Sequence, residues 1–124
     1  MANELELTGI VKYNKSGVKA ELSLSTRIDI DGAKVSENIQ QVTSNAAGGD
    51  IEIGSMGLDS HPYIMIENLD DTAVLTVRTT ASSNPNILTI PARTFAGPMK
   101  LESTVLKMLS SVSDSKARII AIEP

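Results

Sequence analysis

The chain has no cysteine and no tryptophan, and among its 124 residues there are only one phenylalanine and two tyrosines. The absence of cysteine excludes disulfide bonds, so a chain of this length has to be held together by its own apolar core. With so few rings, that core is expected to be aliphatic. Proteins that bind single-stranded nucleic acid stack bases on aromatic side chains, and most carbohydrate sites stack sugars similarly, so both functions are disfavoured.

Positive charge and long apolar runs are also scarce. Fifteen acidic residues against eleven basic ones give a formal charge of −4, the wrong sign for neutralising the phosphates of a duplex. The opening Met-Ala-Asn-Glu-Leu-Glu lacks the basic and apolar regions of a signal peptide, and no apolar run reaches the length of a membrane span. We therefore expect a protein made in the cytoplasm, with neither nucleic acid nor a membrane as partner.

Residues 19–31 carry the clearest periodic pattern. Aliphatic residues and threonine alternate there with charged residues and serines, which predicts a half-buried β-strand with one wet face. Residues 4–13 look extended as well, and Asn14 to Gly17 supply turn chemistry, so the two segments predict a hairpin. The side predicted to be buried consists of Leu22, Leu24, Thr26, Ile28 and Ile30.

Short strands are expected along the rest of the chain. Residues 63–67 are strongly β-prone, and residues 73–80 are expected to return antiparallel to them through a polar turn. The segment 101–112 fits helical and strand spacing equally well, and we favour a strand because its neighbours are strands. About eight to ten short strands with no βαβ alternation predict an all-β antiparallel sandwich or barrel. We expect a single domain over 1–124, with 1–13 either an N-terminal arm or the first strand.

His61 is the only histidine in the chain. Asp59, Ser60 and His61 are adjacent in sequence, whereas a catalytic triad is assembled from distant positions that converge in space. Pro62 follows and holds the histidine in an extended loop. We interpret His61 as an ordinary loop residue and expect the protein not to be an enzyme.

Acidic groups and glycines elsewhere give no stronger signal. Asp29-Ile30-Asp31-Gly32 resembles half of a calcium loop, but the downstream ligands have the wrong spacing. Glu67, Asp70 and Asp71 gather around a turn, where Asx side chains are expected to cap backbone amides. Gly48-Gly49 lacks the Lys-Ser/Thr pair of a phosphate loop. The sequence thus predicts no catalytic residues, no cofactor and no metal site.

Tyr63 to Asp70 form an aliphatic strand that ends in Asn-Leu-Asp, and a small residue and another β-branched strand follow. This segment resembles small structural proteins of tailed bacteriophages, most of all capsid cement (decoration) proteins. The likeness takes in Pro91 to Met99 and the aliphatic Arg118 to Glu123. It departs at Thr72-Ala73-Val74, where that family often has an aromatic residue.

The resemblance implies a jelly-roll-like sandwich located in the virion and made in the host cytoplasm. Its expected function is to bind the outer capsid surface and stabilise the shell by bridging major capsid subunits. Two alternatives remain open: a neck, tail or fibre-base component, and a virion-surface receptor- or glycan-binding module. Self-association as a dimer or a trimer fits equally well. The candidate interaction residues are apolar side chains of the N-terminal segment, Leu5, Leu7 and Ile10.

Overall fold

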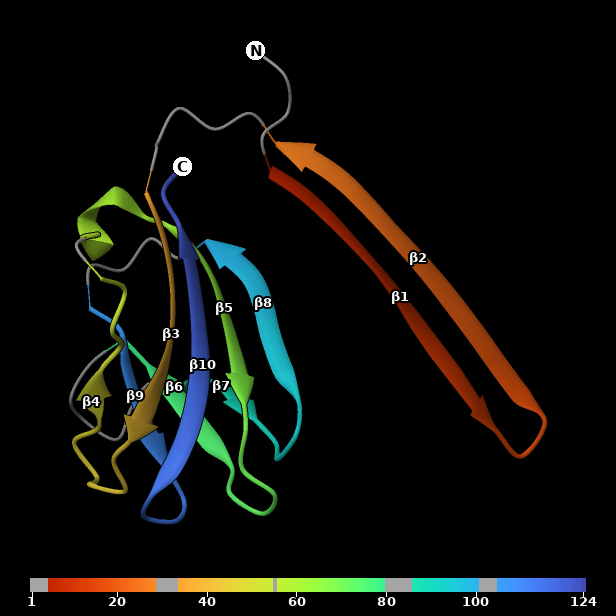
Figure 1. Ribbon diagram of the computed structural model, residues 1–124. Helices are drawn as coiled ribbons and strands as arrows, with labels where there is room; N and C mark the ends of the chain where they lie inside the picture. Colours follow the sequence, from red (N-terminus) through yellow and green to blue (C-terminus); the bar gives the residue numbers. More distant parts are fainter. Residues whose placement is uncertain (1–4, 29–33, 55, 80–85, 101–104) are drawn as a thin grey trace. The chain divides into compact units, whose positions relative to one another are not determined.

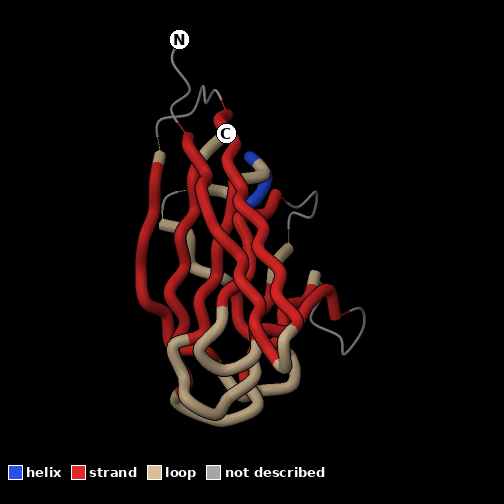
Figure 2. Tube along the Cα trace, turned by 90° about the vertical axis from the view of Figure 1, so that its right-hand side faces the viewer, coloured by secondary structure: helices blue, strands red, loops and turns tan. Residues whose placement is uncertain are grey.

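The computed structural model describes residues 5–28, 34–54, 56–79, 86–100 and 105–124. The chain divides into two compact units, Met1–Asp31 and Gly32–Pro124 (Figure 1). Strands dominate both units, and the only helical segment within the described ranges is a single 3-10 turn, η1 (Leu58–Ser60) (Figure 2). Accordingly, none of the described residues form a helix long and apolar enough to cross a membrane. The sandwich expected over 1–124 therefore begins after Asp31, and the expected arm over 1–13 is part of a longer unit.

The first unit contains a β-hairpin made of β1 (Leu5–Lys15) and β2 (Val18–Ile28). The strands are antiparallel and paired along their whole length, from Leu5 opposite Ile28 to Lys15 opposite Val18. The two turn residues, Ser16 and Gly17, both have positive φ, at 51° and 81°. Two successive positive φ values match the type I′ turn, whose twist suits a two-residue hairpin. The predicted hairpin is thus confirmed.

The second unit is a sandwich of two four-stranded sheets, with strand orders β3-β10-β5-β8 and β4-β9-β6-β7. All pairings within both sheets are antiparallel. Counted within the sandwich alone, the orders are first-eighth-third-sixth and second-seventh-fourth-fifth, the arrangement of a jelly roll. The predicted all-β jelly-roll sandwich is confirmed. Its strands are β3 (Val35–Val42), β4 (Gly49–Asp50), β5 (Tyr63–Asn68), β6 (Leu75–Arg78), β7 (Asn86–Ile90), β8 (Phe95–Lys100), β9 (Lys107–Ser110) and β10 (Ser115–Ile122).

One predicted pairing is wrong. Residues 63–67 and 73–80 were expected to form a hairpin, but β5 pairs with β10 and β8, whereas β6 pairs with β9 and β7 in the other sheet. The polar turn between β5 and β6 crosses from one sheet to the other. In the segment 101–112, residues 107–110 form the strand β9, as favoured, and residues 101–104 lie outside the described part.

The core lies between the two sheets and is aliphatic, as the composition predicts. β10 contributes Ala117, Ile119 and Ala121, all fully buried, and they alternate with residues on its outer side. Within the described residues, the core cluster contains no aromatic side chain. The remaining members are Val42, Ile51, Ile53, Met56, Ile64, Ile66, Leu75, Val77, Ile90, Leu106 and Met108. All of them belong to the second unit, so the sandwich has a complete core of its own.

A buried amide joins the two sheets at the end of β5. The side chain of Asn68 donates hydrogen bonds to the carbonyl oxygens of Ala73 (2.9 Å) and Ile90 (3.0 Å). Its Oδ1 accepts a hydrogen bond from the backbone amide of Asp70 at 3.0 Å. Asn68 is only 1% exposed, so these bonds replace the water that a buried amide would otherwise need.

Candidate protein-interaction surfaces

The hairpin β1–β2, called the arm below, has one apolar face. Residues that lie opposite each other in an antiparallel pair project to the same side of the sheet. The only charge at the positions of this face is Lys15, which lies next to the turn. The arm's apolar face consists of Leu5, Leu7, Gly9, Val11, Tyr13 and Lys15 from β1, and of Val18, Ala20, Leu22, Leu24, Thr26 and Ile28 from β2.

Most of this apolar face is open to solvent. Val11, Tyr13, Val18, Leu22 and Leu24 are 52–60% exposed. The sequence pattern places the aliphatic residues on one side correctly, and the hairpin itself leaves that side uncovered. A two-stranded hairpin is marginal in water unless its apolar side packs against something. An exposed face of this kind is a candidate interaction surface.

The opposite face of the arm is polar. Arg27 Nε lies 3.7 Å from the Glu6 carboxylate, and Lys12 is registered opposite Glu21. Ile10, 61% exposed, is the one large apolar side chain at the described positions of this face. Charged and small polar groups on one side, with aliphatic groups on the other, make the arm amphipathic.

The residues predicted for interaction lie on both sides of the arm. Leu5 is 8% exposed and Leu7 is half-buried, and both belong to the apolar face, whereas Ile10 projects from the polar face. Sequence reasoning missed the more exposed members of the apolar face, such as Leu22 and Leu24. The turn could have identified them, because a two-residue loop at Ser16-Gly17 fixes which residues of the two strands share a side.

A second exposed apolar surface lies on the sandwich, on the outer side of the sheet β3-β10-β5-β8. The register aligns Val35, Ile122 and Tyr63 across three strands, and places Ile120 beside Met65 in the next row. Ile39 and Phe95, 57% and 67% exposed, extend the surface on the two edge strands, and Val35 is 70% exposed. The name outer face is kept below for Val35, Ile39, Tyr63, Met65, Phe95, Ile120 and Ile122.

Charged side chains lie within the rows of the outer face, where Arg118 is opposite Ile39 and Glu37 is opposite Ile120. Arg118 on β10 lies between two carboxylates: its Nη1 is 3.0 Å from Glu67 and its Nε is 4.0 Å from Glu37. Lys100 Nζ lies 5.7 Å from the centroid of the Tyr63 ring, within the range of a cation–π contact. The outer face therefore mixes apolar residues with an arginine and two carboxylates in the same rows, and these three charges pair with one another.

The polar groups considered from the sequence include His61 and two aspartates. His61 follows η1 with a left-handed backbone, at φ 50°, so the extended conformation expected before Pro62 is wrong. Asp29 and Asp31, considered for calcium, lie outside the described residues. Within the part of the chain that the structure describes, no group of three or more His, Cys, Asp or Glu side chains is placed to hold a metal ion.

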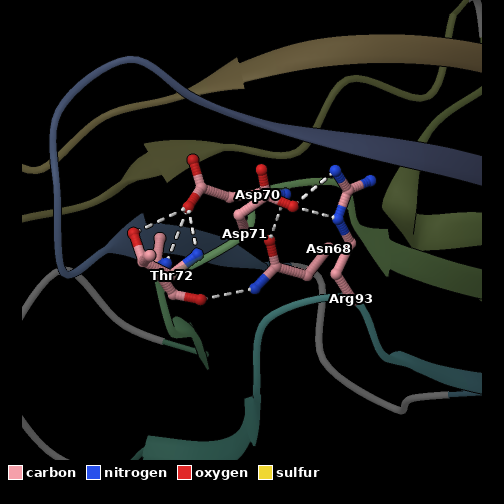
Figure 3. Close-up of polar contacts among 6 residues, drawn as sticks. Asn68, Asp70, Asp71, Thr72 and Arg93 are labelled. Carbon is pink, nitrogen blue, oxygen red and sulfur yellow. Dashed lines mark hydrogen bonds and ion pairs between the residues drawn. The ribbon is translucent and has the colours of Figure 1, made fainter.

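The carboxylates around the β5–β6 turn have separate structural partners (Figure 3). Asp70 Oδ1 accepts hydrogen bonds from the backbone amides of Thr72 (2.8 Å) and Ala73 (2.7 Å). These two amides lower the pKa of Asp70 below its ordinary value of 3.8, because they bind the charged form. Asp71 pairs with Arg93. The predicted capping of backbone amides is confirmed for Asp70.

A surface hollow of about 620 Å³ lies beside β3 and β4. Asp50 on its rim pairs with Lys107, whose Nζ is 2.6 Å from the carboxylate. Asn38 lines the hollow and donates a hydrogen bond to the carbonyl oxygen of Glu52 at 2.9 Å. The other lining residues are Ile51, Ile53, Gly54, Met56 and Leu58. The polar groups of the hollow thus tie β3 to the loop after β4, and β4 to β9.

Comparison of the chain with protein-family models, with curated proteins and with solved structures finds no match. The function therefore has to be argued from the residues of this chain.

Proposed function

We propose that this chain is a non-enzymatic structural protein of a tailed-phage virion, which binds the outer capsid surface and bridges major capsid subunits. The observation that carries the proposal is the arm, whose apolar face is exposed over most of its length. Such a face gains free energy mainly when another protein covers it.

Three further features support this role. The jelly-roll order of the sandwich is an architecture that recurs in viral shell proteins. The segment Tyr63–Asp70, which carries the resemblance to cement proteins, forms β5 and the start of its turn. The core is complete within residues after Asp31, so the arm is free to serve an interaction without unfolding the sandwich.

The direct test is binding to phage capsids that lack this protein. Purified full-length chain is mixed with expanded capsids, unbound protein is removed by sedimentation, and bound copies per particle are counted. We expect saturable binding at hundreds of copies and a higher melting temperature of the decorated shell. Absence of binding to expanded capsids would refute the cement function.

Copy number separates this proposal from its closest alternative. A neck, tail or fibre-base component would occur at about a dozen copies or fewer per particle, as expected for an assembly around one symmetry axis. A receptor- or glycan-binding module would bind a glycan array, which the cement function does not predict. Electron microscopy of the particle measures location and copy number together.

A further inference from the structure

The chain carries two exposed apolar surfaces of the same kind: the arm's apolar face and the outer face of the sheet β3-β10-β5-β8. Each is one side of a β-sheet, and sheets pack face to face through such sides at about 10 Å separation. Each surface is uncovered within its own unit, with Leu22 and Leu24 more than half exposed on one and Val35 and Phe95 on the other.

We propose that two copies of this chain exchange arms, so that the apolar face of each arm packs on the outer face of its partner's sandwich. Two reciprocal contacts of this kind cover both exposed surfaces in both copies. A second copy and a capsid subunit cannot cover the same face of the arm at once, so the inference concerns the protein free in solution, away from a particle.

The charges on the two surfaces are compatible with this packing. The arm's apolar face is uncharged apart from Lys15 next to the turn, so most of it can be desolvated without burying an ion. On the outer face, Arg118 is already held by Glu37 and Glu67. A highly charged partner would find no unpaired counter-charge in this row, whereas the neutral, aliphatic arm of a second copy needs none.

The area favours a reciprocal exchange. Strands of eleven residues make the arm about 35 Å long and about 10 Å wide, a footprint of roughly 350 Å². One arm on one sandwich would bury roughly 700 Å² in total, which is the size of a crystal contact. Two exchanged arms would bury roughly 1,400 Å², within the range of stable, specific interfaces. Packing of arm on arm would bury only the smaller area and would leave both outer faces exposed.

Cross-linking of the full-length chain tests the contact, since the protein has no cysteine of its own. Leu22→Cys places a thiol on the arm's apolar face, and Met65→Cys places one on the outer face. The two single variants, one of them enlarged by a tag, are mixed, equilibrated and mildly oxidised. We expect a mixed covalent dimer, with a yield at least tenfold higher than that of Ser23→Cys mixed with Met65→Cys. Ser23 is the matched control because it adjoins Leu22 but lies on the polar face of the arm.

Sedimentation of the unmodified protein measures the assembly itself. A mass of two chains at micromolar concentration is expected. Leu24→Asp should weaken the dimer at least tenfold, whereas Ser25→Asp, on the polar face of the same strand, should leave it unchanged. Both positions are exposed, and circular dichroism checks that the sandwich stays folded in each variant.

Four results would overturn the exchange. The protein could be monomeric, or its assembly could contain more than two chains. The Leu22→Cys variant could cross-link chiefly to itself, which would indicate packing of arm on arm. A double variant with both cysteines could close a disulfide within one chain, which would indicate that the arm covers its own sandwich. None of these outcomes bears on capsid binding, which is measured separately on particles.

Discussion

Replacing Asn68 by alanine should destabilise the sandwich strongly. The substitution removes two hydrogen bonds donated to the carbonyl oxygens of Ala73 and Ile90 and one accepted from the amide of Asp70. Each buried polar group that loses its partner costs about 1–3 kcal/mol. Because some of these groups can regain water at the turn, we expect a total loss of about 3 kcal/mol in the free energy of unfolding.

Asn45→Ala is the matched control for this experiment. The Asn45 side chain also accepts a hydrogen bond from an amide two residues later, that of Ala47 at 3.1 Å, but it is exposed. Its removal should cost under about 1 kcal/mol, since water replaces the lost partner. Urea unfolding followed by circular dichroism compares the two variants with the unsubstituted chain. Equal losses for Asn68→Ala and Asn45→Ala would refute the view that the buried amide joins the sheets.

Three further predictions concern the turn, a glycine and the core. Asp70 has a lowered pKa when folded, so its stabilising effect is complete above the ordinary value of 3.8 and is lost as pH falls through the lowered value. The free energy of unfolding, measured from pH 2 to 6, should therefore fall less steeply with decreasing pH in Asp70→Asn than in the unsubstituted chain. An unchanged slope would contradict this. Gly97 has φ +102°, and a Cβ there would lie 2.5 Å from the carbonyl oxygen of Ile64, so Gly97→Ala should cost about 2 kcal/mol or more. Gly9→Ala, with nothing within 4 Å, should leave sandwich stability unchanged, and equal melting temperatures of the two alanine variants would count against the close approach at residue 97. Leu75→Ala truncates a fully buried side chain and should lower the unfolding free energy by about 3 kcal/mol; a loss below about 1 kcal/mol would show that the site is loosely packed.

Local patterns predict the arm well. Period-two alternation in residues 19–31 and turn residues at Ser16-Gly17 specify a hairpin, because both signals act between neighbours in sequence. The turn lies at Ser16-Gly17 and the strand β2 begins directly after it, as these signals indicate. The jelly-roll order was expected from the resemblance and not from periodicity, which left a sandwich and a barrel equally open.

Two features could not be predicted because they depend on distant parts of the chain. The turn after Asn68 has the same chemistry whether the next strand returns in the same sheet or crosses to the other. The pairing of β6 with β9, about thirty residues later in the chain, determines that the strand crosses to the other sheet. Alternation in β2 likewise shows which side chains share a side, but nothing in the residues around Leu22 and Leu24 specifies the surface that covers them.

The position of β10 has a consequence for synthesis of the protein. β10 pairs with β3 on one side and with β5 on the other, so it completes the middle of its sheet although it is the last of the sandwich strands to leave the ribosome. Until Ser115–Ile122 emerge, β3 has no neighbour in that sheet. The arm, by contrast, needs only contacts close in sequence and can form in microseconds. A newly made chain therefore displays its arm while the sandwich is still incomplete, and partners that recognise both surfaces can engage fully only after synthesis has passed β10.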